Sequence, residues 1–149
     1  MATIFSRIIA GEIPGRFVWS DDLCVAFLST GPHTEGHALV VPRAEVDNVL
    51  DADEELVAHL AVVARRIGAA QRAATGAPRA MIVVAGFEVP HLHVHVYPAW
   101  DETVLDPAVA RSDVPDEEMD AAAERLRAAI RETGFPANVP AEPGTSPTV

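Results

Sequence analysis

A chain of 149 residues in which 49% are hydrophobic has the size and composition of a single globular domain with one core. Its formal net charge of −11 excludes the basic surface that nucleic acids and anionic membranes attract, so we expect neither as a partner. No apolar run approaches the roughly 20 residues of a membrane span, the first residues show no export signal, and the single cysteine, Cys24, cannot form an intrachain disulfide. We therefore expect a cytoplasmic protein.

The first third of the chain predicts three strands. Residues 16–20 and 23–28 are rich in β-favouring side chains and flank an acidic turn dipeptide, which is typical of a hairpin. Residues 29–36 collect Gly, Pro, Ser and Thr and predict a loop. Residues 37–42 then form a third strand that ends in proline. Together these segments predict an antiparallel meander.

A long amphipathic helix is predicted over residues 53–75. Acidic residues crowd its first turn, and Gly76 follows its end. Its apolar positions recur at intervals of three and four residues and are Leu56, Leu60, Val63, Ile67 and Ala70. Residues 79–85 and 91–97 predict two more strands.

A second helix is bracketed by Ser112 or Asp113 as its cap, with Pro115 in the first turn, and by Gly134 after its last turn. The fold class is thus α+β, with a meander sheet, one long helix and a C-terminal helix. We expect one domain over residues 1–134. Residues 135–149 carry four prolines and little to bury, which predicts a mostly disordered tail.

Three histidines occupy alternate positions, His91, His93 and His95. A β-strand has a side-chain period of two, so a strand here would place all three imidazoles on one face. The interposed residues, which would point the other way into apolar packing, are Leu92, Val94 and Val96. Such a row is a candidate site.

The residues alone leave three interpretations of this row. Two histidines separated by one residue can chelate zinc. However, His91 and His95 would lie about 13 Å apart at a rise of about 3.3 Å per residue, so only two ligands come easily. Alternatively, the middle imidazole, His93, is a nucleophile for phosphorus and its neighbours stabilise charged oxygens. The third interpretation is that the histidines only pack on a half-exposed sheet.

Four segments of the chain together resemble the histidine triad (HIT) superfamily, closest to its nucleoside phosphoramidase branch. These segments are Thr3–Pro14, Ala26–Leu28, Gly36–Arg43 and Pro90–Tyr97. The likeness covers residues 3–132. It implies an α+β meander with a long helix, paired as a homodimer with a joint sheet. It also implies hydrolysis or transfer of a nucleoside monophosphate without a metal or other cofactor.

The resemblance assigns roles to individual residues. His93 matches the nucleophile that forms a nucleotidyl-histidine, His91 and His95 match its flanking partners, and His37 matches a fourth histidine near the site. The positions that match a purine-binding pocket are Phe5, Ile8, Ile13, Phe27 and Leu39.

The chain also departs from the family pattern. Ser29 stands where an aspartate usually accepts hydrogen bonds from the ribose. The residues before the triad are Gly86-Phe87-Glu88 in place of Gly-Gln-Ser or Gly-Gln-Thr, so a contact to phosphate is lost. Glu88 could act as a general acid if its pKa were raised, or remain a solvated carboxylate. Thr3 and Ser6 replace a cysteine pair that builds a zinc site in many bacterial members, so we expect no zinc.

These features predict an enzyme that cleaves a nucleoside monophosphate, of a purine by preference, from a phosphoramidate or phosphoanhydride. Two alternatives stay open. The first is a HIT-like protein that binds nucleotides with little catalysis. The second is a metal-dependent hydrolase that uses the histidine row.

Overall fold

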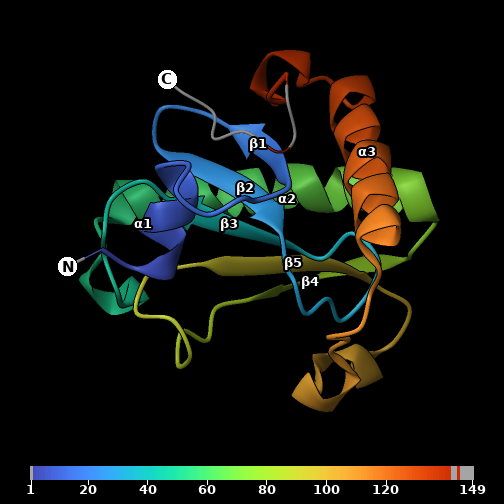
Figure 1. The fold of residues 1–149 in the computed structure, drawn as a ribbon, viewed down its shortest axis with the longest axis horizontal. Helices are drawn as coiled ribbons and strands as arrows, with labels where there is room; N and C mark the ends of the chain where they lie inside the picture. Colours follow the sequence, from blue (N-terminus) through green and yellow to red (C-terminus); the bar gives the residue numbers. More distant parts are fainter. Residues whose placement is uncertain (1, 142–143, 145–149) are drawn as a thin grey trace.

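A computed structural model describes residues 2–141 and 144, and this part of the chain forms an α+β fold around a five-stranded antiparallel sheet (Figure 1). The strand order across the sheet is β1-β2-β3-β5-β4. The strands are β1 (Phe17–Ser20), β2 (Cys24–Leu28), β3 (Ala38–Pro42), β4 (Arg79–Val83) and β5 (Val94–Ala99). The expected fold class is confirmed.

The first three strands form the predicted meander, in which β1 pairs with β2 and β2 with β3. The next strand in the chain does not extend it. β5 pairs with β3, with Leu39 opposite His95, and β4 lies outside β5 at the edge of the sheet. The chain therefore crosses from β3 to the far edge and returns through β5, which places the strand that follows His91 and His93 between β3 and β4.

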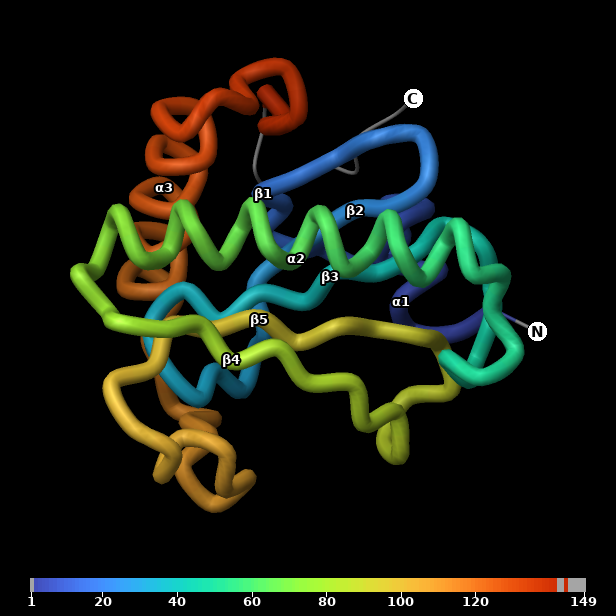
Figure 2. Tube along the Cα trace, turned by 180° about the vertical axis from the view of Figure 1, so that it is seen from behind, coloured from blue at the N-terminus to red at the C-terminus, as the bar shows by residue number. Residues whose placement is uncertain are grey.

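Helix α2 (Glu54–Thr75) makes this crossing and covers one face of the sheet (Figure 2). Its predicted apolar stripe is buried at Leu60, Val63, Ile67 and Ala70. A Cβ at Gly68 would stand 3.1 Å from the Cβ of Ala80, so glycine permits the close approach of the helix to β4. Gly76, with φ of +75°, ends the helix as predicted.

The opposite face is covered by a short helix, α1 (Ile4–Ile9), which the sequence analysis did not predict (Figure 1). A capping box starts it, because the Thr3 side chain accepts from the Ser6 backbone and the Ser6 side chain accepts from the Thr3 backbone. Beneath it lies a separate apolar cluster of Phe5, Ile8, Phe17, Val25, Phe27, Leu39 and Val41. Six residues are too few for hydrophobic periodicity to reveal a helix.

Helix α3 (Asp116–Glu132) begins later than predicted, because Pro115 occupies the N-cap and neither Ser112 nor Asp113 does. Pro115 makes no side-chain cap bond, and three acidic residues in the first turn interact with the positive end of the helix instead. Within residues 2–141 and 144, no helix combines the length and apolar character needed to cross a bilayer.

Ordered structure continues past the domain boundary that we expected at residue 134. Phe135 packs against the main core, and Val139 is buried in it. The fully buried Arg127 of α3 donates to the carbonyls of Phe17 and Pro140, which ties this segment to β1. The rest of the expected tail, residues 142–143 and 145–149, lies outside the described residues.

Candidate active site

The histidine row spans the start of β5 and does not lie wholly within a strand. The strand predicted over residues 91–97 is Val94–Ala99, so His91 and His93 precede it and only His95 belongs to the ladder. The alternation nevertheless holds. Leu92, Val94 and Val96 all lie in the main core, whereas the rings of His93 and His95 lie together, with centroids 5.0 Å apart.

His93 has only one ring nitrogen available to a substrate. Its Nδ1 lies 2.7 Å from the carbonyl oxygen of His91. Because a carbonyl can only accept, Nδ1 carries the proton and the lone pair is on Nε2. The ring of Phe5 stands edge-on against that of His93 at 4.9 Å between centroids. His93 therefore combines a fixed orientation with the tautomer that a nucleophile requires.

His91 is fully buried and anchored at both ring nitrogens. Its Nε2 donates to the carbonyl of Pro42 at 2.8 Å, and burial lowers the pKa of the imidazole, so the ring is neutral with a lone pair on Nδ1. The Thr3 hydroxyl, 2.7 Å away, therefore donates to Nδ1. This contact could not be predicted from the sequence, because it requires α1 to fold back onto the histidine row.

His37 and His95 form a hydrogen-bonded pair. The backbone N–H of His33 donates to His37 Nδ1 at 3.0 Å, so His37 carries its proton on Nε2. That nitrogen donates to His95 Nδ1 at 2.9 Å, which leaves the proton of His95 on Nε2. His95 is thus a hydrogen-bond donor beside the nucleophile. His33, which orients His37, was not among the predicted site residues, because loop residues carry no periodic signal.

We expect the free energy of unfolding to decrease as the pH falls from about 6.5 toward 5. Burial, with smaller effects of neighbouring histidines, lowers the pKa of His37 to about 3 and that of His95 to about 4. The unfolded chain takes up these protons near pH 6.5, so it binds more protons than the folded chain in this window. Above pH 6.5 both histidines are neutral in the folded and in the unfolded chain, so they do not reduce the free energy of unfolding there. Urea titrations at pH 7 and pH 5 measure the loss.

His37→Asn provides the control, because it removes one histidine whose pKa is lowered by burial and leaves every carboxylate in place. We expect its loss of stability between pH 7 and pH 5 to be smaller than that of the unmodified protein by about 1–2 kcal/mol. Equal losses in the two proteins would show that His37 is not held neutral by the fold.

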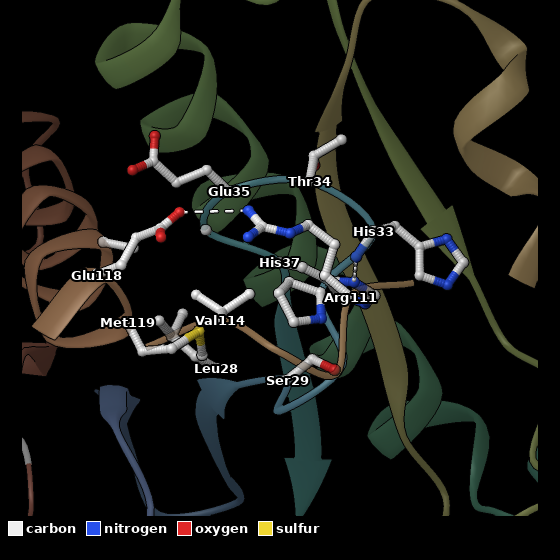
Figure 3. A pocket seen from close by; sticks show the side chains of 13 residues that line it. Leu28, Ser29, His33, Thr34, Glu35, His37, Arg111, Val114, Glu118 and Met119 are labelled. Carbon is white, nitrogen blue, oxygen red and sulfur yellow. Dashed lines mark hydrogen bonds and ion pairs between the residues drawn. The ribbon is translucent and has the colours of Figure 1, made fainter. Parts of the chain in front are cut away.

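A pocket of about 60 Å³ is lined by His37 and Ser29 and by none of the three histidines of the row (Figure 3). Arg111 crosses it and pairs with Glu118 at 3.3 Å. The Ser29 hydroxyl accepts from the backbone N–H of Gly31. Ser29 and His37 are therefore brought together at a small pocket in which Arg111 is already paired with Glu118.

A larger cleft of about 230 Å³ lies beside His93. Asp47 and Asn48 line one side, and the segment from Val84 to Phe87 lines the other. The Phe87 side chain is 98% exposed at this cleft, and Glu88 next to it is also exposed. The cleft gives a ligand access to His93 from solvent.

The residues that match a purine-binding pocket converge on one face of the sheet. Phe5, Ile8, Phe27 and Leu39 belong to the apolar cluster under α1, and Ile13 packs against it. Phe5 joins this cluster to the row, since its ring also contacts that of His91. The predicted apolar residues thus lie beside the triad, whereas Ser29 lies at the pocket behind His37.

The residues near α1 do not fit a zinc ion. Thr3 and Ser6 offer hydroxyls, which are not the sulfur and imidazole ligands that zinc prefers, and both hydroxyls are engaged in the capping box. In the row itself, His91 uses both ring nitrogens, and only Nε2 of His93 and of His95 remain available. The donors present support at most the two-ligand chelate that the spacing of the row allows.

Among the described residues, one group of side chains has metal-ligand proximity, and it lies away from the row at Asp21, Cys24 and His59. Its donors are already used. The Asp21 carboxylate accepts from Trp19 Nε1 and from two backbone N–H groups and lies 2.8 Å from His59 Nε2. Burial raises the pKa of the Cys24 thiol, which keeps it protonated. This cluster anchors the β1–β2 turn.

An antiparallel sheet that presents an oriented histidine between two others is the arrangement of a histidine triad protein. The model of the HIT domain family matches residues 10–101, and the chain belongs to this family. An uncharacterized HIT-like protein of Saccharolobus solfataricus is 37% identical over 77% of this chain and 84% of its own. An uncharacterized HIT-like protein of Mycobacterium tuberculosis is 32% identical over 87% of this chain and 94% of its own.

Solved structures agree with this assignment. A zinc-bound histidine triad family protein from Mycobacterium smegmatis superposes with a TM-score of 0.76 at 28% identity, over 89% of this chain and 95% of its own. A hypothetical histidine triad nucleotide-binding protein from Sulfolobus tokodaii also has a TM-score of 0.76, at 29% identity over 86% of this chain and 91% of its own. The superfamily that the motif indicated is thereby confirmed.

Proposed function

We propose that this protein cleaves a nucleoside monophosphate from a phosphoramidate or phosphoanhydride through a nucleotidyl-histidine at His93. Nε2 of His93 attacks the α-phosphorus, and the bond to the leaving group breaks as the phosphorus–nitrogen bond forms. The leaving group departs with the bonding electron pair and takes a proton from solvent. His95 Nε2–H donates to the phosphoryl oxygens as their charge develops. Water then attacks the phosphorus, loses its proton to solvent and releases the nucleoside monophosphate with His93 restored.

The observation that carries this proposal is the hydrogen bond from His93 Nδ1 to the carbonyl of His91. It places the lone pair on Nε2 without a charged partner or a metal, and imidazole nitrogen is a competent nucleophile at neutral pH. The ring of Phe5 packs edge-on against that of His93, and His93 lines the adjacent cleft.

We further propose that the base of a purine nucleotide is held by the apolar residues under α1. These residues meet the row at Phe5, so a base held among them would place its phosphate near His93. The structural neighbour from Sulfolobus tokodaii is described as nucleotide-binding, which supports this ligand class. The residues proposed to contact the base are Phe5, Ile8, Ile13, Phe27 and Leu39.

A second candidate function, nucleotide binding with little catalysis, is favoured by the residues around the row. Ser29 offers one hydroxyl, bonded to the backbone of Gly31, where a ribose would meet a carboxylate in the family pattern. Phe87 and Glu88 are exposed and offer no amide or hydroxyl side chain to a phosphate. Such a protein would retain affinity for the nucleotide and lack the fast chemical step.

A panel of adenylyl and guanylyl phosphoramidates, anhydrides and dinucleotides separates the candidates. Release of the nucleoside monophosphate that is unchanged by a chelator supports the proposed enzyme. Binding by calorimetry without release supports the binding protein, and release that the chelator abolishes supports the metal-dependent hydrolase. Either of the last two results would overturn the proposal.

We propose that the protein is a homodimer joined through the β4 edge. Within the described part of the chain, β4 has a sheet neighbour on one side only, and an open strand edge offers unpaired backbone groups to another chain. Two apolar side chains are exposed along this segment, Ile82 at 51% and Val84 at 44%. We expect Ile82→Glu to lower the dimer affinity at least about tenfold, because two carboxylates would be placed near the joint.

Sedimentation velocity over a concentration series measures this dissociation. Leu105→Glu is the matched control, since Leu105 is 46% exposed in the turn of residues 102–105 after β5. The control variant should assemble like the unmodified protein. A monomer at every concentration, or equal weakening by both substitutions, would contradict a β4 interface.

A further inference from the structure

The segment that carries His91 and His93 lies outside the sheet ladder. The pairing of β3 with β5 begins at Val40 opposite Val94, after both histidines. The backbone of this segment is held by a bond from the N–H of His91 to Val89 and one from Leu92 to Val46. The His91 carbonyl that orients His93 is therefore placed by local contacts, and the two ring anchors of His91 are among them.

One of those anchors comes from the N-terminal end of the chain. The Thr3 hydroxyl accepts from the Ser6 backbone N–H at 3.0 Å and donates its single proton to His91 Nδ1 at 2.7 Å. The other anchor is the carbonyl of Pro42 at the end of β3. His91 is thus clamped between α1 and the sheet, and its own carbonyl holds Nδ1 of His93.

We infer that Thr3 is a positioning residue, which acts through His91 to hold the nucleophile His93 in its reactive tautomer and orientation. Its hydroxyl fixes the His91 ring, and the His91 carbonyl then fixes the proton of His93 on Nδ1. Loss of the hydroxyl leaves a buried lone pair on His91 without a donor, and the segment is free to move to recover one. The kinetic consequence rests on the proposed function, whereas the effect on the two imidazoles does not.

The competing explanation is that Thr3 only caps α1. Ser6→Ala separates the two roles, because it removes the other half of the capping box and leaves the Thr3 hydroxyl and His91 in place. Thr3→Val removes the hydroxyl with little change of shape, and Thr3→Ser restores it. Thr3→Asp retains a good helix cap but can only accept, so His91 must take a second proton.

The test measures the tautomers of His91 and His93 by ¹⁵N NMR of histidine-labelled protein, together with kcat and KM. We expect Thr3→Val to move His93 toward a mixture of its two tautomers and to lower kcat about tenfold, because a smaller fraction of His93 would hold its lone pair on Nε2 in the reactive orientation. The kcat values of Thr3→Ser and Ser6→Ala should stay within about threefold of that of the unmodified protein. Thr3→Asp should raise the pKa of His91.

Two results would overturn the inference. The first is a Thr3→Val protein whose His91 and His93 signals match those of the unmodified protein. The second is a Ser6→Ala protein that changes these signals and kcat as much as Thr3→Val does, which would assign the effect to the helix cap. If no variant shows turnover, including the unmodified protein, the proposed function fails, and the NMR signals alone decide the role of Thr3.

Discussion

His93→Asn is expected to lower turnover of a nucleoside phosphoramidate at least about a thousandfold while the fold and nucleotide binding persist. Asparagine cannot form the phosphorus–nitrogen bond on which the reaction depends. It is smaller than histidine, and its side-chain amide can still donate to the carbonyl of His91. Single-turnover kinetics measure the chemical step, and calorimetry measures the affinity for the nucleoside monophosphate.

His59→Asn is the matched control for this prediction. It makes the same histidine-to-asparagine substitution at a histidine of α2, which pairs with Asp21 and lies away from the row. We expect its turnover to stay within about threefold of the unmodified protein. Full activity of His93→Asn would end the proposed mechanism, whatever the control shows.

The second large effect is expected at His95, whose substitution by alanine should lower kcat about a hundredfold, the range seen when a donor to a developing oxyanion is removed. His37→Ala should cost about tenfold, because His37 acts by keeping the proton of His95 on Nε2. A double-mutant cycle tests whether His37 acts through His95. In the His95→Ala background, the loss of His37 should change kcat little.

Multiplicative losses in that cycle would contradict the hydrogen-bonded pair as the source of both effects. The pH profile adds a second readout. Burial keeps His37 and His95 neutral, so neither should appear as an ionisation of kcat between pH 5 and pH 8. An ionisation in this range that disappears in His95→Ala would show that His95 acts as a charged acid.

The elements with strong periodicity could be predicted from the sequence. The stripe of α2 and the alternation around His93 both follow from the geometry of one element, so local sequence suffices. The start of β5 could not be predicted in the same way. The alternation continues through His91, but the ladder begins only at Val94, where the neighbouring strand supplies partners.

The rest of the site depends on contacts between segments far apart in the chain. The tautomer of His95 is set by His37 and the backbone of His33, and that of His93 is set by the His91 carbonyl. No spacing rule encodes these bonds. The cap of α3 and the ordered residues after Gly134 likewise depend on tertiary packing, since Phe135 and Val139 are stabilised by a core that the local composition does not reveal.

The proposed mechanism requires a covalent bond between His93 and a nucleotide. Rapid quench during turnover of an adenylyl phosphoramidate, followed by peptide mass spectrometry, tests it directly. The account predicts a peptide heavier by one adenylyl group on the imidazole of His93, formed and consumed at the rate of turnover and absent from His93→Asn. Turnover without any adduct in the unmodified protein, or an adduct on a different residue, would contradict it.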